Sequence, residues 1–344
     1  MSESKHRRIT LAAHPKGAPK DSDFALIEDA IRSPGAGELL LRTIYLSLDP
    51  YMRGRMNPVK SYSPFVEVGG TMVGGTVSEV MSSDVAGFAP GDLVFGYTGW
   101  QSHAIDNGKG LRKLDPEAAP ISTALGILGM PGHTAYVGLL DIGRPKAGET
   151  VVVSAASGAV GSAVGQIARI SECRIVGIAG APQKCRYAVD ELGFDACVSH
   201  LDPHLPARLA EACPEGIDVY YDNVGGKVLA AAFDLLNVAA RVPICGMISH
   251  YNDTAPPPGP DSLPAFMRGI LTRRLTIQGF IIFDHQHRWK NFHDDMAGWI
   301  RDGRVKYRED IVDGLENAPR AFQGLLKGSN FGKLIVRVGD DPTL

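Results

Sequence analysis

The feature that most constrains the fold is a strand, a glycine-containing turn and a helix in the stretch 151–169, VVVSAASGAVGSAVGQIAR. Its first three residues are β-branched valines, which are typical of a buried parallel strand. Val160, Val164 and Ile167 recur at helical spacing, so we expect a helix to begin near Ala159. This pattern predicts one crossover unit of a parallel sheet.

The turn is similar to the dinucleotide-binding fingerprint GxGxxG, although Ala156 stands where the fingerprint has its first glycine. A glycine at position 158 lets the backbone approach a pyrophosphate, and Gly161 lets the helix pack against the strand. The helix N-terminus adds free N–H groups and partial positive charge. A plain packing turn is the alternative interpretation. The position between a strand and a helix favours the pyrophosphate site.

The end of the next predicted strand, RIVGIAG, indicates which dinucleotide binds. NAD sites usually carry an acidic residue there, bonded to the ribose 2′-hydroxyl. No Asp or Glu occurs between Gly177 and Arg186, and Lys184 lies in that interval. A carboxylate would repel a 2′-phosphate and a lysine attracts it, so the sequence predicts NADP(H). The alternative is that Lys184 is an ordinary solvated helix residue.

The chain changes character along its length. Residues 23–114 consist of short apolar runs cut by Gly, Pro and Asp, a pattern that predicts an all-β unit. After about Ile127, strand and helix patterns alternate, which predicts a doubly wound parallel sheet of the α/β class. The stretch 330–339, NFGKLIVRVG, reads as a further strand that returns to the first domain.

Composition excludes several function classes. The formal net charge is −3 without long charged runs, so nothing favours nucleic acid or a membrane surface as a partner. No uninterrupted apolar run reaches the roughly 18 residues of a membrane span. The first residues contain no apolar secretory core. Five cysteines without a CxxC spacing favour reduced thiols, and we expect a cytoplasmic protein.

Several long stretches make the chain resemble the zinc-independent medium-chain dehydrogenases/reductases, in the group of prostaglandin, alkenal double-bond and curcumin reductases. The stretches that carry the resemblance are ITLAAHPKGAP, LSLDPYMRGRM, LGMPGHTAYVGLLDIGRPKAGETVVVSAASGAVGSAVGQIA, YDNVGG, ICGMISHYN and GSNFGKLIVRV. The resemblance implies a GroES-like β-barrel substrate domain over 1–127, completed by 309–344. It implies a Rossmann NADP-binding domain over 128–308. It also implies a homodimer that reduces the carbon–carbon double bond of α,β-unsaturated ketones and aldehydes with NADPH.

The resemblance also assigns residues to the cofactor and substrate. The pyrophosphate turn comprises Gly158, Ala159, Val160 and Gly161, and Lys184 takes the place of the 2′-phosphate lysine. His200 stands where the family often has a tyrosine. The remaining cofactor-binding residues implied are Met130, Thr134, Asn223, Cys245, Ser249, Phe280, Ile281, Ile282 and Asn330. Tyr51, in the barrel domain, is implied to contact substrate.

The zinc site of related alcohol dehydrogenases is not expected. The chain has no cysteine before Cys173 and lacks a Gly-His-Glu signature in its first domain. His14, His103 and His133 are scattered histidines, which are more often surface or hydrogen-bonding residues. We therefore predict that no metal takes part.

Tyr251 is the candidate catalytic residue. Hydride addition to the β-carbon of an enone moves negative charge onto the carbonyl oxygen, and a preorganised O–H donor lowers that barrier. A tyrosine hydroxyl stays protonated at neutral pH, and Tyr251 follows the predicted cofactor loop, so we expect it to face the reacting carbonyl of the substrate. The cofactor's ribose hydroxyl is the alternative proton donor. Tyr251 would then only pack the wall of the site.

Two other functions stay open at this point. One is an NADPH quinone reductase of the zeta-crystallin type, which shares the fold and the cofactor. The other is a non-enzymatic NADPH-binding protein, which needs a phosphate loop but no proton donor. The stretches DPYMRG and SHYN disfavour the first, and Tyr251 disfavours the second.

Overall fold

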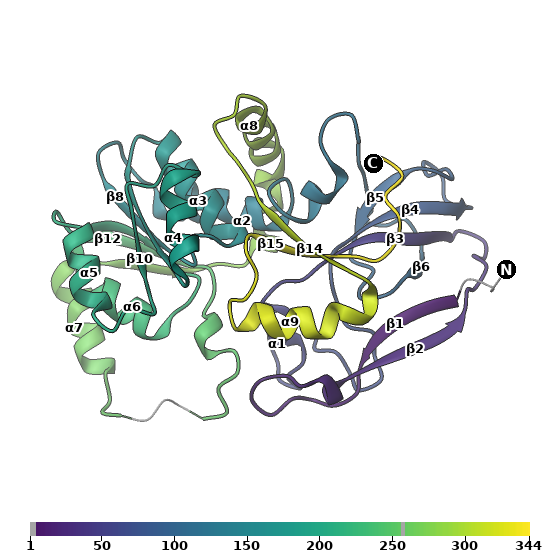
Figure 1. Cartoon of the computed structure of the whole chain (residues 1–344), viewed down its shortest axis with the longest axis horizontal. Helices are drawn as coiled ribbons and strands as arrows, with labels where there is room; N and C mark the ends of the chain where they lie inside the picture. Colours follow the sequence, from purple (N-terminus) through teal and green to yellow (C-terminus); the bar gives the residue numbers. More distant parts are fainter. Residues whose placement is uncertain (1–4, 256–258) are drawn as a thin grey trace. The chain divides into compact units, whose positions relative to one another are not determined.

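The computed structural model describes residues 5–255 and 259–344 (Figure 1). Its contacts divide the chain into unit 1, Met1–Gly126 with Glu309–Leu344, and unit 2, Ile127–Arg308. The sequence-based boundary at residue 127 lies one residue later than this division. Within the described ranges, no helix is both long enough and apolar enough to span a bilayer.

Unit 2 is built on a parallel sheet. Its strands are β8 (Thr150–Ser154), β9 (Arg174–Ala179), β10 (Ala196–Ser199), β11 (Ile217–Tyr221), β12 (Leu236–Ile244) and β13 (Thr276–Gly279). They lie in the order β10-β9-β8-β11-β12-β13, and every neighbouring pair is parallel. Numbered from β8, this is the Rossmann order 3-2-1-4-5-6. The prediction of a doubly wound parallel sheet is confirmed.

Helices cover both faces of this sheet because its strands are apolar on both sides (Figure 1). On one face, Val152 and Tyr220 belong to a core cluster with apolar residues of the helices α5, α6 and α7. On the other face, α3 packs on β8 and β9 and also contacts α2. The helices of unit 2 are α2 (Met130–Val137), α3 (Ala159–Ile170), α4 (Pro182–Asp190), α5 (Leu205–Ala212), α6 (Gly226–Phe233), α7 (Leu263–Arg273) and α8 (Trp289–Arg301).

The last strand of the parallel sheet is shorter than the sequence suggests. The apolar run 275–283, LTIQGFIIF, predicts one continuous strand, but pairing stops at Gly279. Gly279 pairs with Ile244, where β12 itself ends, so the backbone beyond has no neighbouring strand to bond. The chain instead turns into a 3₁₀ helix over Ile282–Arg288. The apolar run alone could not reveal where the partner strand ends.

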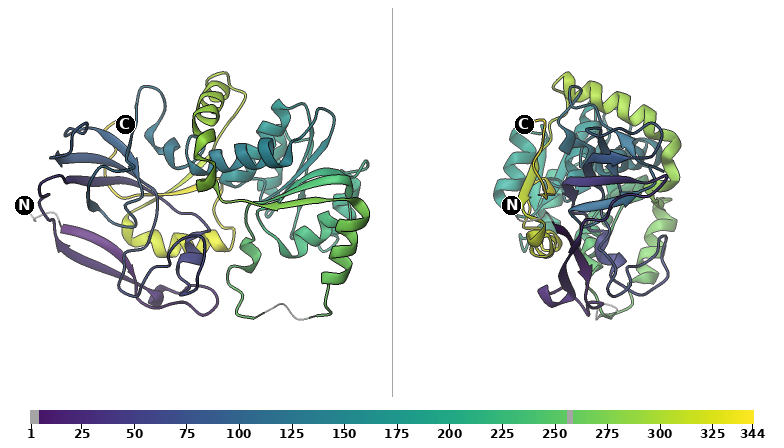
Figure 2. Two further views of the ribbon diagram at one scale, coloured as in Figure 1. Left: turned by 180° about the vertical axis from the view of Figure 1, so that it is seen from behind. Right: turned by 90° about the vertical axis from the view of Figure 1, so that its right-hand side faces the viewer.

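Unit 1 contains an antiparallel hairpin and a larger sheet of order β14-β15-β3-β4-β5-β7, with β6 also paired to β3. Figure 2 shows the yellow C-terminal strands running beside the purple-blue strands of the N-terminal part. β15 pairs antiparallel with β3, so the C-terminal stretch 330–339 contributes a strand to this sheet. The elements are β1 (Lys5–Leu11), β2 (Phe24–Ala30), β3 (Leu39–Ser47), α1 (Met52–Arg55), β4 (Thr76–Ser83), β5 (Leu93–Gly96), β6 (His103–Asp106), β7 (Arg112–Lys113), β14 (Glu309–Asp313), α9 (Ala318–Leu326) and β15 (Lys333–Arg337).

A buried ion pair fastens the C-terminal strand of unit 1 to the segment that directly follows β3. Lys333, the first residue of β15, donates from Nζ to Asp49 Oδ1 at 2.7 Å and to the Leu48 carbonyl at 2.8 Å. Nearby, the Trp100 ring packs edge-on against Phe322 of α9, with ring centroids 5.7 Å apart. Because these contacts join residues from both ends of the chain, unit 1 needs its C-terminal segment to complete its core.

Candidate active site

The candidate residues of unit 2 gather at one edge of the parallel sheet. All its strands run in the same direction, so their carboxyl ends lie at a common edge. The strand order reverses between β8 and β11, the switch point at which open α/β sheets bind ligands. The residues that follow the strands are Gly158 after β8, Lys184 after β9, His200 after β10, Asn223 after β11, Cys245 and Ser249 after β12, and Phe280 after β13.

Packing requires the second glycine of the turn after β8. A Cβ at Gly161 would lie 2.2 Å from the Ala155 carbonyl oxygen, so the helix could not approach the strand. A Cβ at Gly158 would lie 3.2 Å from the same oxygen. Ala155 has φ of +54°, a left-handed conformation that is uncommon for a residue with a side chain. The turn is therefore held in one shape by close backbone contacts.

The N-terminus of α3 suits an anion. Gly158 is the N-cap residue, no side chain caps the helix, and its first turn contains no acidic residue. Gly158, Ala159 and Val160 are half-buried rather than covered. The first amides of a helix have no partner within it, and they concentrate partial positive charge. This donor set fits a pyrophosphate.

Basic side chains gather near the ends of β9 and β10. Lys184 lies in the first turn of α4, where no acidic residue occurs. Burial lowers the pKa of His200, and the neighbouring charges of Lys227 and Lys184 lower it further. Lys227, on α6, was not anticipated from the sequence, because it lies 27 residues beyond His200. Three cationic or potentially cationic groups in one region suit a phosphate group.

A buried network organises the switch point between β8 and β11. The Asp222 Oδ1 atom accepts hydrogen bonds from Ser154 Oγ, Tyr220 OH and the amides of Val224 and Gly225, all at 3.0–3.1 Å. Sequence analysis missed Ser154 and Asp222. The available signal was their position, since each is a polar residue at the carboxyl end of a strand.

The same network fixes Asn223, which the sequence did single out. Its backbone amide donates to Ser154 Oγ at 2.8 Å, and its side-chain Nδ2 donates to the Ser154 carbonyl at 2.8 Å. Both bonds join the ends of β11 and β8, two strands that are adjacent in the sheet but far apart in the sequence. Asn223 is therefore held directly at the switch point.

Tyr221, also missed, brings three candidate segments together. Its hydroxyl donates to the Thr134 carbonyl at 2.9 Å and contacts the Cys245 thiol. A Cβ added to Gly138 would lie 2.6 Å from this hydroxyl and 2.7 Å from the Phe280 ring. Burial raises the pKa of Cys245 to about 12, so its thiol stays protonated. Helix α2 and the segments after β12 and β13 thus converge here.

Thr134 is fixed by its own helix. Its Oγ1 donates to the Met130 carbonyl, one turn earlier in α2, at 2.8 Å. The same Oγ1 lies 3.5 Å from the Met130 sulfur. The two residues therefore act as one packed face of α2.

The loop after β12 folds back on itself, so that Tyr251 contacts residues earlier in the same loop. Ser249 Oγ donates to the Val224 carbonyl at 2.5 Å, which ties the loop to the segment after β11. The Tyr251 hydroxyl accepts from the Met247 amide at 3.4 Å and lies close to Gly246. That contact uses the hydroxyl oxygen as acceptor. After β13, Ile281 precedes the 3₁₀ helix and Ile282 is its first, buried residue.

Two candidate residues belong to unit 1. Tyr51 is the N-cap residue of α1, and the Arg55 guanidinium lies 5.9 Å from its ring centroid and 4.1 Å from that of Tyr62. Burial raises the pKa of Tyr51 well above its usual range. Asn330 precedes β15, and its Nδ2 donates to the Gly332 carbonyl at 2.7 Å.

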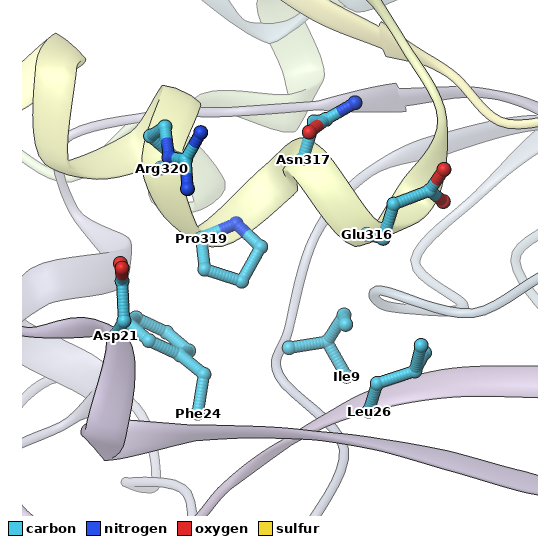
Figure 3. A pocket seen from close by; sticks show the side chains of 8 residues that line it. All are labelled: Ile9, Asp21, Phe24, Leu26, Glu316, Asn317, Pro319 and Arg320. Atoms are coloured by element: carbon cyan, nitrogen blue, oxygen red, sulfur yellow. The ribbon is translucent and has the colours of Figure 1, made fainter.

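A surface pocket of about 230 Å³ in unit 1 contains none of the candidate residues (Figure 3). It lies between the β1–β2 hairpin and α9, and it is lined by Ile9, Asp21, Phe24, Leu26, Glu316, Asn317, Pro319 and Arg320.

In the parts of the chain that the structure describes, no three His, Cys, Asp or Glu side chains are grouped to hold a metal ion. His14 instead hydrogen-bonds through Nδ1 to the Met56 carbonyl at 2.8 Å.

Comparison with known families gives two matches. Residues 7–114 match the family described as the N-terminal domain of oxidoreductase, and residues 159–298 match the family described as zinc-binding dehydrogenase. These two segments fall in unit 1 and unit 2 respectively.

Individual relatives match over nearly the whole chain. NADPH-dependent curcumin reductase of Escherichia coli (strain K12) is 54% identical over 343 residues, covering 99% of both chains. Prostaglandin reductase 1 of Rattus norvegicus is 42% identical over 335 residues, covering 95% of this chain and 98% of its own. The crystal structure of CurA from Vibrio vulnificus in complex with NADPH has a TM-score of 0.95 and 52% identity. That match covers 97% of this chain and all of the other.

Proposed function

The chain belongs to the zinc-independent group of medium-chain dehydrogenases/reductases, and from this premise we propose that it is an NADPH-dependent enone and alkenal reductase. It reduces the carbon–carbon double bond of α,β-unsaturated ketones and aldehydes by hydride transfer to the β-carbon. The observation that carries this function is the carboxyl edge of the parallel sheet. There, the uncapped N-terminus of α3 and the basic region after β9 and β10, with no acidic residue in the first turn of α4, fit NADPH.

Different residues of unit 2 bind different parts of the cofactor. The amides of Gly158, Ala159 and Val160 bind the pyrophosphate, and Gly161 keeps α3 close enough for this contact. Lys184 and His200 bind the 2′-phosphate. The ribose and nicotinamide parts contact Met130, Thr134, Asn223, Cys245, Ser249, Phe280, Ile281 and Ile282, and the resemblance to the reductase group assigns Asn330 to the cofactor as well.

When bound, NADPH supplies the hydride, and the protein stabilises the charge that develops on the substrate. Tyr251 donates a hydrogen bond, and then a proton, toward the carbonyl oxygen as negative charge gathers there. The Met247 amide orients the Tyr251 hydroxyl by donating to its oxygen. The resemblance to the reductase group supports a substrate contact by Tyr51. Protonated Cys245 and Tyr221 keep the inner wall of the site neutral.

The decisive experiment measures NADPH oxidation against a panel of enones, alkenals, quinones and simple aldehydes. We expect turnover with enones and alkenals and a product saturated at the double bond. Faster turnover with quinones would instead support a quinone reductase. Tight NADPH binding without turnover on any member of the panel would support a non-enzymatic binding protein.

We also propose a cytoplasmic homodimer. The support is the similarity to the reductase group together with an odd number of cysteines without CxxC spacing, which suits a reducing compartment. Light scattering coupled to size-exclusion chromatography gives the mass directly. A mass of one chain, 36.8 kDa, at micromolar concentration would contradict the homodimer.

A further inference from the structure

Two of the five cysteines lie against each other beside the basic region of unit 2. Cys185 is in the first half of α4 and Cys197 is in β10, and their thiols are hydrogen-bonded. Both sulfurs lie against the backbone of Ala179, the last residue of β9. Cys197 pairs in register with Gly177, and a Cβ at Gly177 would lie 3.1 Å from the Cys197 sulfur. The glycine thus makes room for the thiol pair.

Cys185 differs chemically from the other four cysteines, because only its pKa is lowered, whereas the hydrogen bond from Cys185 and burial raise the pKa of Cys197 well above its usual range. Burial raises the pKa of Cys173 and of Cys213 to about 11 and that of Cys245 to about 12, so these thiols stay protonated and unreactive. The hydrogen bond from Cys197 lowers the pKa of Cys185 to about 7. Both residues of the pair are half-buried rather than fully covered, as a reaction with a small oxidant requires.

We propose that Cys185 and Cys197 form a reversible disulfide on exposure to a peroxide, and that this disulfide weakens NADPH binding. The Cys185 thiolate attacks one peroxide oxygen, the O–O bond breaks, and a sulfenic acid and water are formed. The Cys197 sulfur then attacks the sulfenic sulfur and displaces a second water. The two thiols lose two electrons and two protons, and the peroxide gains both. A dithiol reductant reverses the reaction by exchange.

The consequence for the cofactor follows from the position of Cys185, and it rests on the proposed function. Lys184 immediately precedes Cys185, and the amides of both donate to the Ala181 carbonyl in the first turn of α4. A disulfide of about 2.05 Å is shorter than any thiol hydrogen bond, so its closure draws this turn toward β10. No side-chain cap anchors the start of α4, and Gly180 precedes its N-cap residue. The Gly180 carbonyl accepts from Ser199 Oγ of β10 at 2.6 Å, so the start of α4 already lies against β10, and closure of the disulfide shifts Lys184 relative to that strand.

The test begins with peptide mapping of the full-length protein, reduced or treated with hydrogen peroxide and then digested with trypsin. Cleavage after Lys184 and Arg186 releases Cys185 in a dipeptide. The expected product is this dipeptide joined to the peptide 187–208, which contains Cys197. The number of titratable thiols should fall from five to three and return to five with dithiothreitol.

Cofactor binding is then measured by fluorescence titration, independently of turnover. Loss of one charge-assisted contact predicts about ten-fold weaker NADPH binding by the oxidised protein, with NADH binding unchanged. The variants Cys185→Ser and Cys197→Ser should bind NADPH normally and lose the response to peroxide. Cys213→Ala, which removes a buried thiol elsewhere in unit 2, should keep the full response.

Two results would overturn the proposal. One is no loss of thiols, or a cross-link that involves any other cysteine. The other is a Cys185–Cys197 disulfide whose formation leaves the NADPH dissociation constant unchanged. A reduced protein that does not bind NADPH at all would instead contradict the proposed function, so the two failures are distinguishable.

Discussion

Asp222 in unit 2 and Asp49 in unit 1 are both buried carboxylates, but they hold different kinds of structure together. Asp222 is 1% exposed and accepts four uncharged donors, two of them backbone amides of the segment that follows β11. Asp49 is 6% exposed and pairs with the ammonium of Lys333, 284 residues away. The first shapes a loop at the sheet edge, and the second joins two ends of the chain.

The difference between Asp222 and Asp49 shows that buried polar groups have different roles in the two units. In a parallel sheet the strand ends meet at one edge, so polar residues there become available to a ligand. In the mixed sheet of unit 1, the buried ion pair instead fixes a strand that is distant in the sequence. Changes in the first class should therefore affect ligand binding or turnover, and changes in the second should affect folding stability.

Lys333→Ala should have the largest effect. It leaves Asp49 buried without its cation, and breaking a buried pair costs about 3–5 kcal/mol. We expect the free energy of unfolding, measured with denaturant, to fall by that amount while the folded protein binds NADPH normally. The double variant Asp49→Leu with Lys333→Met removes both charges and should lose much less stability. An unchanged unfolding midpoint for Lys333→Ala would contradict this role.

His133 is an exception that tests the comparison, because it lies in unit 2 yet should affect stability. It is buried between Phe292 and Trp289, with ring centroids 5.2 and 5.3 Å away. Burial, and then the neighbouring His285, lower its pKa to about 4. The folded state thus favours neutral His133, whereas the unfolded chain binds a proton below about pH 6.5.

Above pH 6.5, His133 is neutral in both the folded and the unfolded state, and the free energy of unfolding is at its full value. As the pH falls toward 4, the unfolded chain binds a proton at His133 and the folded protein does not, so the free energy of unfolding decreases. The loss approaches about 3 kcal/mol at the lower limit. His133→Phe keeps an aromatic ring and removes the titrating group. Denaturant unfolding between pH 7 and 4.5 should therefore show a shallower decline for His133→Phe. Parallel declines for the two proteins would show that His133 does not contribute.

Tyr251→Phe should lower the turnover number by about ten- to a hundred-fold, the low end of general acid catalysis, because the ribose hydroxyl partly replaces it. The ring is kept, so the NADPH dissociation constant and the unfolding midpoint should not change. Steady-state kinetics on several enones separates these quantities. If Tyr251→Phe has the turnover number of the unaltered enzyme with every enone, Tyr251 only packs against the site and donates no proton.

Lys184→Ala should raise the Michaelis constant for NADPH about ten-fold and leave the weak activity with NADH nearly unchanged. Lys146→Ala is the matched control, since Lys146 is exposed in the same unit but precedes β8 at the opposite edge of the sheet. It should change neither constant. Equal use of NADH and NADPH by the unaltered enzyme would contradict the assignment of Lys184.

Chelation should have no effect. Enone reduction by the proposed route uses hydride and an O–H donor, and neither requires a Lewis acid. Exhaustive treatment with a chelator should leave turnover intact, and elemental analysis should find far less than one metal per chain. Stoichiometric zinc whose removal abolishes turnover would place this chain with the metal-dependent dehydrogenases.

Much of the fold could be predicted because its signals are local. The valine run of β8, the glycines of the turn and the helical spacing of α3 all lie within about twenty residues. The sequence was a poorer guide to where individual helices and strands of unit 2 begin and end. The apolar pattern of residues 227–237, KVLAAAFDLLN, predicts one helix, but α6 stops at Phe233 and β12 begins at Leu236, because pairing with β11 competes for those residues.

The sequence by itself determined the α/β class and the alternation of strands and helices that produces a parallel sheet. It also indicated NADPH, because no acidic residue lies between Gly177 and Arg186. These depend on side-chain period and on neighbours along the chain. Only the tertiary structure decided that Tyr221 joins Thr134 to Cys245, that Lys227 lies near His200, and that Cys185 contacts Cys197. The physical reason is that the order of strands in the sheet, rather than distance along the chain, sets which strand ends become neighbours.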